Sequence, residues 1–346
     1  FIGGQVNVVT RSGTNEFHGS AFIEYTDDHI RGDRVLAFDN TASSGTFGTR
    51  QYRPVDSQFR ERTWGVTVGG PIIRDRLFFF FGYEDYEGNF FLDEGPSDSG
   101  RAVLIPRLTV ASIDTFRAGS NATYGYDPGP FVSSTPPITD QKYFGRLDWI
   151  INDSHRLTLS FQDTHGASFN GSTSDLFANG DSTSQPRIGL ESNQYVKDET
   201  LRTYTAQLNS TWSPSLSTEL RFNHKHTTQN RIVLSEDNTI GNTIVNVQDL
   251  PGVVTTGLNC TVTTSSSNCP QLQFGTNAQS QPNFLDITVW TAEGIARYRS
   301  GDHEFMVGAR YEAQDILNIF GNGYLPAYTF SSYANFLARQ PLAVTL

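Results

Sequence analysis

Hydrophobic and polar residues alternate along several stretches of this chain, and each stretch is followed by a short polar turn and a second alternating run. The clearest case spans residues 142–162, where Tyr143 and Leu147 share one side of the run while Arg146 and Asp148 share the other. Successive side chains of a strand point to opposite faces. The pattern therefore predicts a β-hairpin with one apolar face and one polar face.

Short links and long links follow one another in strict alternation along the chain. Short turns are expected at 74–76, 152–155, 213–217 and 300–303, and long polar links at roughly 27–62, 88–140, 166–199, 229–284 and from 318 onward. Outer-membrane barrels have short periplasmic turns and long extracellular loops. The sequence thus predicts an all-β fold, an antiparallel transmembrane β-barrel with about nine strands. Single-chain bacterial barrels have even strand numbers, and the sequence begins without Met, so we expect a piece of a longer protein whose barrel is not closed.

Composition agrees with strands and excludes membrane helices. Only 37% of the residues are hydrophobic, and no stretch offers the roughly 18 consecutive apolar residues that a membrane helix needs. A barrel tolerates this average, because only alternate residues of each strand face lipid. Aromatic residues make up 12% of the chain, and many lie near the predicted strand ends. Such positions are typical of the aromatic girdles at membrane interfaces.

Charge excludes a general nucleic-acid-binding protein. The formal net charge is -11, and no cluster of Lys and Arg forms a stripe for phosphates. Acidic residues lie in the links, as at Asp27 and Asp28. We interpret them as solvated loop charges; the alternative is a cation site, although no stretch has the spacing of a calcium loop.

Candidate chemistry is sparse. Cys260 and Cys269 lie in one Ser- and Thr-rich link without a nearby His, which favours a disulfide over a metal site and implies an oxidising compartment. The disulfide is expected to stiffen the tip of an external loop. His224 and His226 share a strand face at a spacing that could serve zinc, but the sequence places no third ligand. We find no motif of a hydrolase, metalloprotease or phosphate-binding loop, and expect no metal, no cofactor and no enzymatic activity.

Two stretches carry a family resemblance. Residues 3–22, GGQVNVVTRSGTNEFHGSAF, and residues 64–88, WGVTVGGPIIRDRLFFFFGYEDYEG, resemble the plug-to-barrel passage and the second and third strands of TonB-dependent outer-membrane receptors. The Oar-like branch, whose members carry a carboxypeptidase-regulatory-like domain ahead of the plug, is the most similar. The resemblance implies that residues 1–16 end a plug domain and that residues 17–346 begin a barrel of about 22 strands.

The resemblance also implies a function. Members of this family sit in outer-membrane lipid and take up scarce, bulky ligands such as iron chelates, cobalamin or glycans. A TonB-type energy-coupling protein drives them through an N-terminal box that this sequence lacks, along with most of the plug and the last strands. Expected ligand contacts for a small molecule or oligosaccharide are loop aromatics, which could instead serve loop packing: Tyr124, Tyr126, Phe131, Tyr195 and Tyr324.

Three functions stay open at this point. The first is this energy-coupled receptor of the bacterial outer membrane. The second is a surface barrel that serves adhesion, assembly or export without energy-coupled uptake. The third is a soluble all-β protein, which would lack a lipid-facing apolar band.

Overall fold

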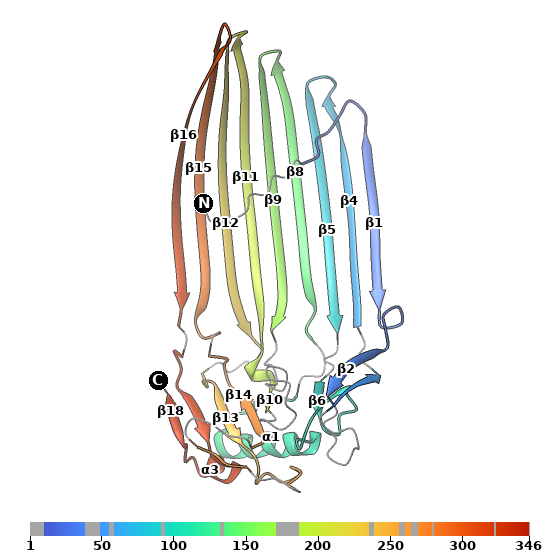
Figure 1. Cartoon of the computed structure of the whole chain (residues 1–346), viewed down its shortest axis with the longest axis vertical. Coiled ribbons are helices and arrows are strands. Elements are labelled where there is room, and N and C mark those ends of the chain that lie inside the picture. The colour runs from blue at the N-terminus through green and yellow to red at the C-terminus, as the bar shows by residue number, and fades with distance from the viewer. Residues whose placement is uncertain are drawn as a thin grey trace.

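A nine-stranded antiparallel sheet forms the long body of the molecule (Figure 1). The computed structural model describes residues 10–38, 49–54, 59–90, 94–131, 135–170, 187–234, 239–255, 260–263, 269–278, 280–321 and 323–345. In spatial order the strands are β1 (His18–Asp27), β4 (Phe59–Ile73), β5 (Leu77–Phe90), β8 (Ile138–Asn152), β9 (His155–Asn170), β11 (Tyr195–Ser213), β12 (Leu216–Val233), β15 (Asn283–Ser300) and β16 (His303–Phe320). The sheet thus has the nine strands that the alternation predicted.

The short turns lie where the sequence placed them, and the strands are longer than expected. β4 and β5 join across residues 74–76, and β8 and β9 across 153–154. β11 contains 19 residues, whereas about 9–11 residues of a tilted strand cross a bilayer. Parts of the predicted links therefore continue the wall of strands beyond the length that a membrane requires.

Strand register sorts the sheet into two faces. Leu159 of β9 pairs with Leu147 of β8 and Ala206 of β11, and this alternation continues across the sheet. Its neighbour Ser160 instead aligns with Arg146 and Thr205. We call the side that carries Leu159 the apolar face and the side that carries Ser160 the polar face.

Two rows of aromatic rings border the apolar face. In the first row, Trp64, Tyr83 and Tyr143 follow one another with ring centroids 5.1 and 4.7 Å apart. The row continues across the sheet through Phe161, Tyr204, His224 and Trp290. The second row lies near the short turns and contains Trp149, Trp212, Tyr298 and Phe305, all exposed. Along β15 the rows are marked by Trp290 and Tyr298, and the nine residues from one to the other match the roughly 9–11 residues of a tilted strand that cross a bilayer.

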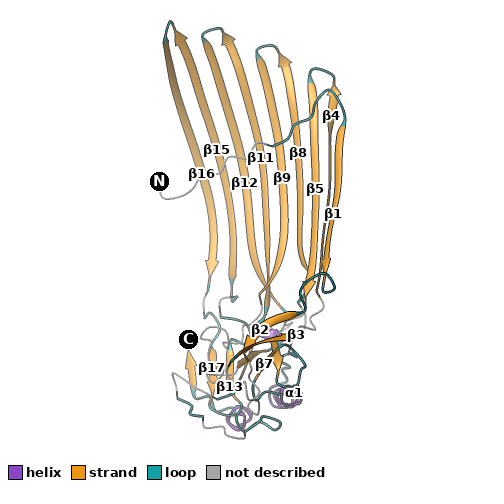
Figure 2. Ribbon diagram, turned by 45° about the vertical axis from the view of Figure 1, so that its right-hand side comes forward, coloured by secondary structure: helices purple, strands orange, loops and turns teal. Residues whose placement is uncertain are grey.

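The long links fold into structure of their own at the end of the sheet opposite the short turns (Figure 2). A second, mixed sheet has the order β10 (Arg187–Gly189), β14 (Gln271–Phe274), β13 (Thr243–Asn246), β17 (Ala327–Phe330) and β18 (Ala343–Thr345). Helices α1 (Val110–Tyr124) and α3 (Tyr333–Leu337), the 3-10 turn Glu191–Asn193 and the pair β6 (Glu94–Pro96) and β7 (Val103–Ile105) complete this region. We call the described residues of 94–131, 187–194, 239–278 and 323–345 the end domain. A separate hairpin, β2 (Arg34–Phe38) and β3 (Arg50–Pro54), lies beside it (Figure 2).

The end domain has a buried hydrophobic core, so the expectation that these links are polar loops was wrong. Phe116 of α1, Val245 of β13 and Leu272 of β14 are fully buried, and Phe330 and Phe336 close the cluster. The local sequence starts and stops α1. The Thr109 hydroxyl accepts the Ser112 backbone N–H, and Gly125 ends the helix in the left-handed region at φ 68°. No helix in the described part of the chain is both long enough and apolar enough to span a membrane.

Candidate ligand-binding site

Two of the predicted contact residues, Tyr124 and Tyr126, line one cavity in the end domain. The cavity has a volume of about 270 Å³ and is walled mainly by aromatic rings from α1, α3, β14 and β17. Its lining residues are Ser120, Tyr124, Tyr126, Thr239, Ile240, Gly241, Thr243, Phe274, Pro326, Tyr328, Phe330 and Phe336. Pockets for small ligands are mostly apolar with a few placed polar groups, and this composition fits that description.

Tyr124 is held firmly at the wall of this cavity. Its hydroxyl donates a 2.5 Å hydrogen bond to the Phe336 carbonyl oxygen, and the two rings lie 4.9 Å apart. The Arg339 guanidinium lies 5.3 Å from the centre of the Tyr124 ring. Burial raises the pKa of the Tyr124 hydroxyl, against the opposing effect of Arg339. The phenol is therefore neutral at physiological pH and keeps the proton that it donates.

Tyr126 and Phe131 contribute mainly to packing. Tyr126 is buried, and its ring centre lies 6.0 Å from that of Phe274. Phe131 packs against the same core without lining the cavity. The Ser120 hydroxyl, itself buried, donates to the Tyr126 carbonyl oxygen at 2.8 Å. These contacts hold the cavity wall in one arrangement.

A second and larger cavity adjoins the first, because Thr239 lines both. Its volume is about 810 Å³, and it lies between the ends of β12 and β15 and the end domain. Tyr324 lines it with a ring that is 73% exposed. Tyr195 lies nearby as the first residue of β11 rather than in a loop, and its ring contacts the Arg231 guanidinium, 5.1 Å away. Arg231 also lines this cavity.

Three of the five predicted residues thus line the two adjoining cavities, Tyr124 and Tyr126 the smaller one and Tyr324 the larger one. Tyr195 contacts the larger cavity's Arg231, and Phe131 lies behind the wall of the smaller one. Sequence reasoning missed Phe274, Tyr328, Phe330 and Phe336, which supply most of the rings of the smaller cavity. Alternating apolar residues at Tyr328 and Phe330 were a usable signal of a strand. Residues distant in sequence form this wall, and no spacing rule connects them.

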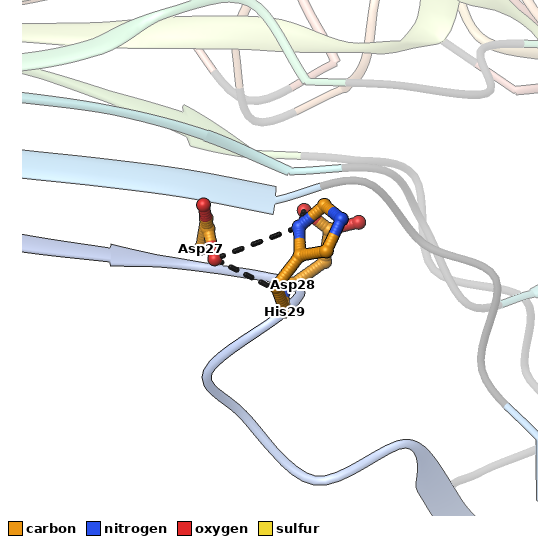
Figure 3. A group of neighbouring side chains, drawn as sticks. All are labelled: Asp27, Asp28 and His29. Carbon is orange, nitrogen blue, oxygen red and sulfur yellow. Dashed lines mark hydrogen bonds and ion pairs between the residues drawn. The ribbon is translucent and has the colours of Figure 1, made fainter.

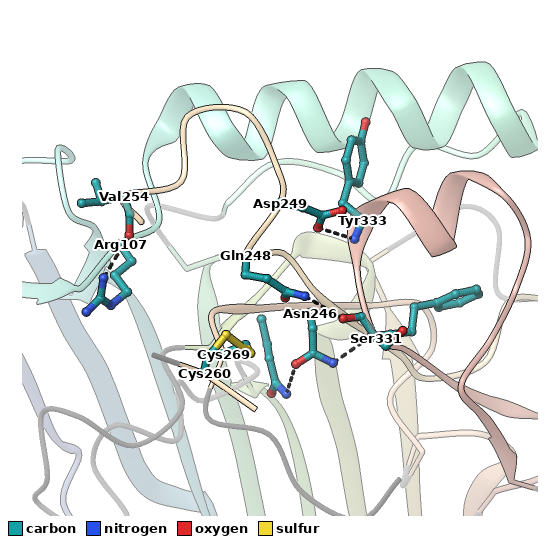
Figure 4. Close-up of a disulfide and its surroundings, with 11 residues drawn as sticks. Arg107, Asn246, Gln248, Asp249, Val254, Cys260, Cys269, Ser331 and Tyr333 are labelled. Carbon is teal, nitrogen blue, oxygen red and sulfur yellow. Dashed lines mark hydrogen bonds between the residues drawn. A yellow bond between two sulfur atoms is a disulfide. The ribbon is translucent and has the colours of Figure 1, made fainter. Parts of the chain in front are cut away.

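The two cysteines form a disulfide that belongs to the end domain (Figure 4). Cys269 is fully buried directly before β14, so the bond does not sit at the tip of an external loop as expected. Nearby polar groups form hydrogen bonds with the segment that contains β17 and the start of α3. Asn246 donates to the Phe330 carbonyl oxygen at 2.7 Å, and the Asp249 carboxylate accepts the backbone N–H of Tyr333 at 2.8 Å (Figure 4).

Ion pairs follow the polar face of the sheet. Arg146 binds Asp148 through two hydrogen bonds of 2.8 Å. Arg221 donates to Glu219 at 2.6 Å and lies 3.6 Å from Glu293. Paired charges of both signs keep this face hydrophilic. Such a surface can line a water-filled passage.

One group of potential metal ligands lies at the end of β1: Asp27, Asp28 and His29, whose ligand atoms lie within 4.8 Å of one another (Figure 3). The Asp27 carboxylate already accepts the His29 backbone N–H at 3.0 Å and the Tyr25 hydroxyl at 3.1 Å. The first is the bond of an Asx turn that ends a strand, and together the two bonds explain the position of the Asp27 carboxylate without an ion.

The histidines that the sequence singled out have separate partners. The His224 ring packs on Trp290 with centroids 3.9 Å apart, within the aromatic row. His226 pairs with Asp286 at 2.9 Å. Each imidazole thus contacts a different residue of β15, His224 a ring and His226 a carboxylate.

Comparisons with known proteins give the family. The family model described as an outer membrane beta barrel domain matches residues 9–89 and 105–344. The TonB-dependent transporter Oar of Myxococcus xanthus is 31% identical over 180 residues, which cover 47% of this chain and 14% of that protein. The structure of the outer membrane transporter YddB from Escherichia coli has a similar fold, with a TM-score of 0.51 at 10% identity over 93% of this chain and 34% of that chain.

The sequence therefore spans a small part of each protein that it resembles. Both proteins are described as transporters, the first as TonB-dependent and the second as an outer membrane transporter. The family model covers most of the described residues, including the two-faced sheet. The chain belongs to the outer membrane beta barrel domain family and is a protein of the bacterial outer membrane.

Proposed function

We propose that this chain supplies part of the wall and part of the ligand-capturing surface of a TonB-dependent transporter for a bulky, scarce ligand. Iron chelates, cobalamin and glycans are the ligand classes that we would test first. The observation that carries the proposal is the position of the end domain. An aromatic-lined cavity lies in a folded domain where a wall with a polar face ends.

The wall suits passage of a polar ligand once it is closed. A nine-stranded sheet with free edges at β1 and β16 leaves backbone hydrogen-bonding groups without partners in lipid. Further strands must pair with these edges, and a barrel of about 22 strands with the polar face inward is the arrangement that we infer. Residues 1–16 then end a plug inside that barrel.

The end domain lies outside the cell in this proposal, because long connections of such barrels are extracellular. A ligand first meets the rings around Tyr124 and Tyr324 and then the ion-paired polar face. Energy enters through a TonB-type protein that binds a region N-terminal to this sequence. In this proposal the described residues bind and conduct the ligand and do not catalyse a reaction, and the protein needs no resident cofactor or metal.

The test uses the full-length protein in outer membranes of its host. A band whose mobility on a gel changes with boiling would support a closed barrel. Cells would then be offered a ferric chelate, cobalamin and an oligosaccharide, with and without the energy-coupling protein. Uptake that needs both proteins supports the proposal. Ligand-independent assembly or export that survives loss of energy coupling would favour the alternative function and overturn it.

A pair of variants tests the cavity. Tyr124→Ala removes a ring from the cavity wall, whereas Tyr52→Ala removes an exposed ring from the β2–β3 hairpin, outside both cavities. We expect the first variant to weaken ligand binding by about tenfold, the usual size of one lost aromatic contact, and the second to leave it unchanged. Equal effects would place the binding surface elsewhere.

A further inference from the structure

The segment before β1 is fastened to the polar face of the sheet near the short turns. At its start, Arg146 of β8 donates to the Thr10 hydroxyl at 2.7 Å and to the Thr10 carbonyl oxygen at 3.2 Å. The same guanidinium is fixed by Asp148, which also accepts a 2.9 Å hydrogen bond from the Thr158 hydroxyl. The donor is thus a side chain that residues of two strands, β8 and β9, hold in place.

The other end of the segment is fixed by a reciprocal pair. Asn15 donates to the Asp75 carboxylate at 2.6 Å, and the Asp75 backbone N–H donates back to the Asn15 side-chain oxygen at 2.8 Å. Asp75 lies in the β4–β5 turn at φ 62°, the left-handed region that non-glycine residues seldom adopt. The turn therefore presents its N–H and its carboxylate together to Asn15.

Glycines let the backbones meet between these two points. A Cβ on Gly13 would lie 2.3 Å from the Phe79 carbonyl oxygen and 2.8 Å from that of Gly70. One on Gly70 would lie 2.4 Å from the Phe17 ring, which covers that strand from the apolar face. The two family-like stretches of the sequence are thus two halves of one contact, and Gly13 and Gly70 are the positions where that contact requires a glycine.

We propose that Thr10–Phe17 is a permanent clasp between the barrel wall and the residues that precede it. The clasp stays seated during the working cycle, so any movement of the preceding region pivots at Thr10 and leaves the start of β1 in place. The first statement rests on the contacts alone. The second rests also on the proposed uptake function.

The contacts are tested by trypsin cleavage after Arg11, an exposed residue within the clasp. A protease needs a detached, extended segment. In the detergent-solubilised full-length protein we expect Gly13→Val to speed this cleavage by at least about tenfold, since the clasp cannot close over an added side chain. Gly32→Val is the matched control, because nothing lies within 4 Å of its added Cβ. If Gly13→Val fails to give a heat-modifiable barrel, Asn15→Ala replaces it in the cleavage test, because this variant removes only the two hydrogen bonds between Asn15 and Asp75. Unchanged cleavage in Asn15→Ala would overturn the clasp.

The permanence of the clasp is tested with a nitroxide label at Thr14→Cys. Both cysteines of this chain are in the disulfide, so the label reacts with the new thiol alone here. Spectra from energised cells and from cells treated with a protonophore should be the same. A mobile component that appears only in energised cells would overturn permanence. Uptake of the ligand panel is measured separately, so loss of the proposed function and loss of the clasp give different results.

Discussion

The nine-stranded sheet and the end domain use apolar side chains in opposite ways. On the sheet, Leu159 and Trp149 are 41% and 46% exposed, although they belong to a continuous apolar face. In the end domain, Phe116 and Val247 are fully buried. The difference teaches that the exposed fraction of an apolar side chain can be interpreted only when the surrounding medium, lipid or water, is known. Lipid covers the apolar face of the sheet, whereas the end domain must shield its core from water.

The two regions also differ in how the chain assembles them. In the large sheet the strands lie side by side in chain order, and four of the eight neighbouring pairs are hairpins joined by short turns. In the end domain, β10 pairs in parallel with β14 although more than 80 residues separate Arg187 from Gln271. The sheet can therefore form pair by pair, whereas the end domain requires several links to meet at once.

The sharpest way to break the comparison is to open the core of the end domain alone. Phe116→Ala removes a fully buried ring that contacts Phe274 and Phe336, with centroids 5.5 and 5.1 Å away. We expect the free energy of unfolding of the end domain to fall by about 3–5 kcal/mol, the usual cost of such a cavity. Limited proteolysis in urea follows this unfolding, and heat-modifiable mobility follows the barrel.

The control lies on the same helix. Val110→Ala removes an exposed side chain of α1 and should change the stability of the end domain by less than about 0.5 kcal/mol. If Phe116→Ala also abolishes the heat-modifiable band, the end domain and the sheet unfold together, and the contrast between them is lost.

A second prediction compares the two faces of the sheet at adjacent residues. Leu159→Arg places a charge on the apolar face and should lower the free energy of unfolding in lipid by about 2–4 kcal/mol, the cost of Arg near the bilayer midplane. Ser160→Arg places the same side chain on the polar face, opposite Arg146 and Thr205. The like charge of Arg146 opposes it, but water screens the pair, so the cost should be about 1 kcal/mol or less. Folding into lipid vesicles measures both. Equal costs would mean that this part of the sheet does not face lipid.

Sequence patterns predicted the sheet well because its rules are local. Alternation at Tyr143, Leu147 and Trp149 fixed the face of β8, and turn residues such as those at 74–76 fixed where the chain reverses. These local rules did not predict the strands and helices that form within the long links. β14 has four residues and β10 has three, which is too few for a period to stand out among polar neighbours.

The candidate site followed the same division. The sequence singled out Tyr124 and Tyr126 because an aromatic residue in a polar link is conspicuous, and both line the smaller cavity. Phe336 contributes as much to the smaller cavity but lies more than 200 residues further along the chain. The spacing of these residues does not predict that α3 packs against the end of α1, because that contact depends on the fold of the whole domain.

The disulfide gives a third, smaller prediction confined to the end domain. Replacing Cys260 and Cys269 by Ala opens a loop with a sequence separation of 9. The loss of this constraint on the unfolded chain should lower the stability of the end domain by about 2–3 kcal/mol. Proteolysis in urea should report the change in the end domain while the heat-modifiable band persists. A protein that loses both would show that the links also hold the strands together.

The smallest predicted effect is a dependence on acid that belongs to the end domain. Arg117 of α1 donates to the Asp127 carboxylate at 3.0 and 2.8 Å and thereby lowers the pKa of Asp127, with help from the Gly129 backbone N–H and against the effect of burial. A lowered pKa in the folded state stabilises the domain above the ordinary carboxyl pKa of about 3.9. That stability is lost as the pH falls through the lowered pKa.

Asp127→Asn and Arg117→Gln should therefore both flatten the loss of end-domain stability between about pH 5 and pH 3. The first variant removes the group that titrates, and the second removes the main cause of its shift. The effect should be modest, because the Asp127 side chain is 48% exposed and water screens the pair. The heat-modifiable mobility of the barrel should not change in either variant. If Asp127→Asn flattens the dependence of end-domain stability on pH and Arg117→Gln does not, Arg117 is not what stabilises the ionised carboxylate.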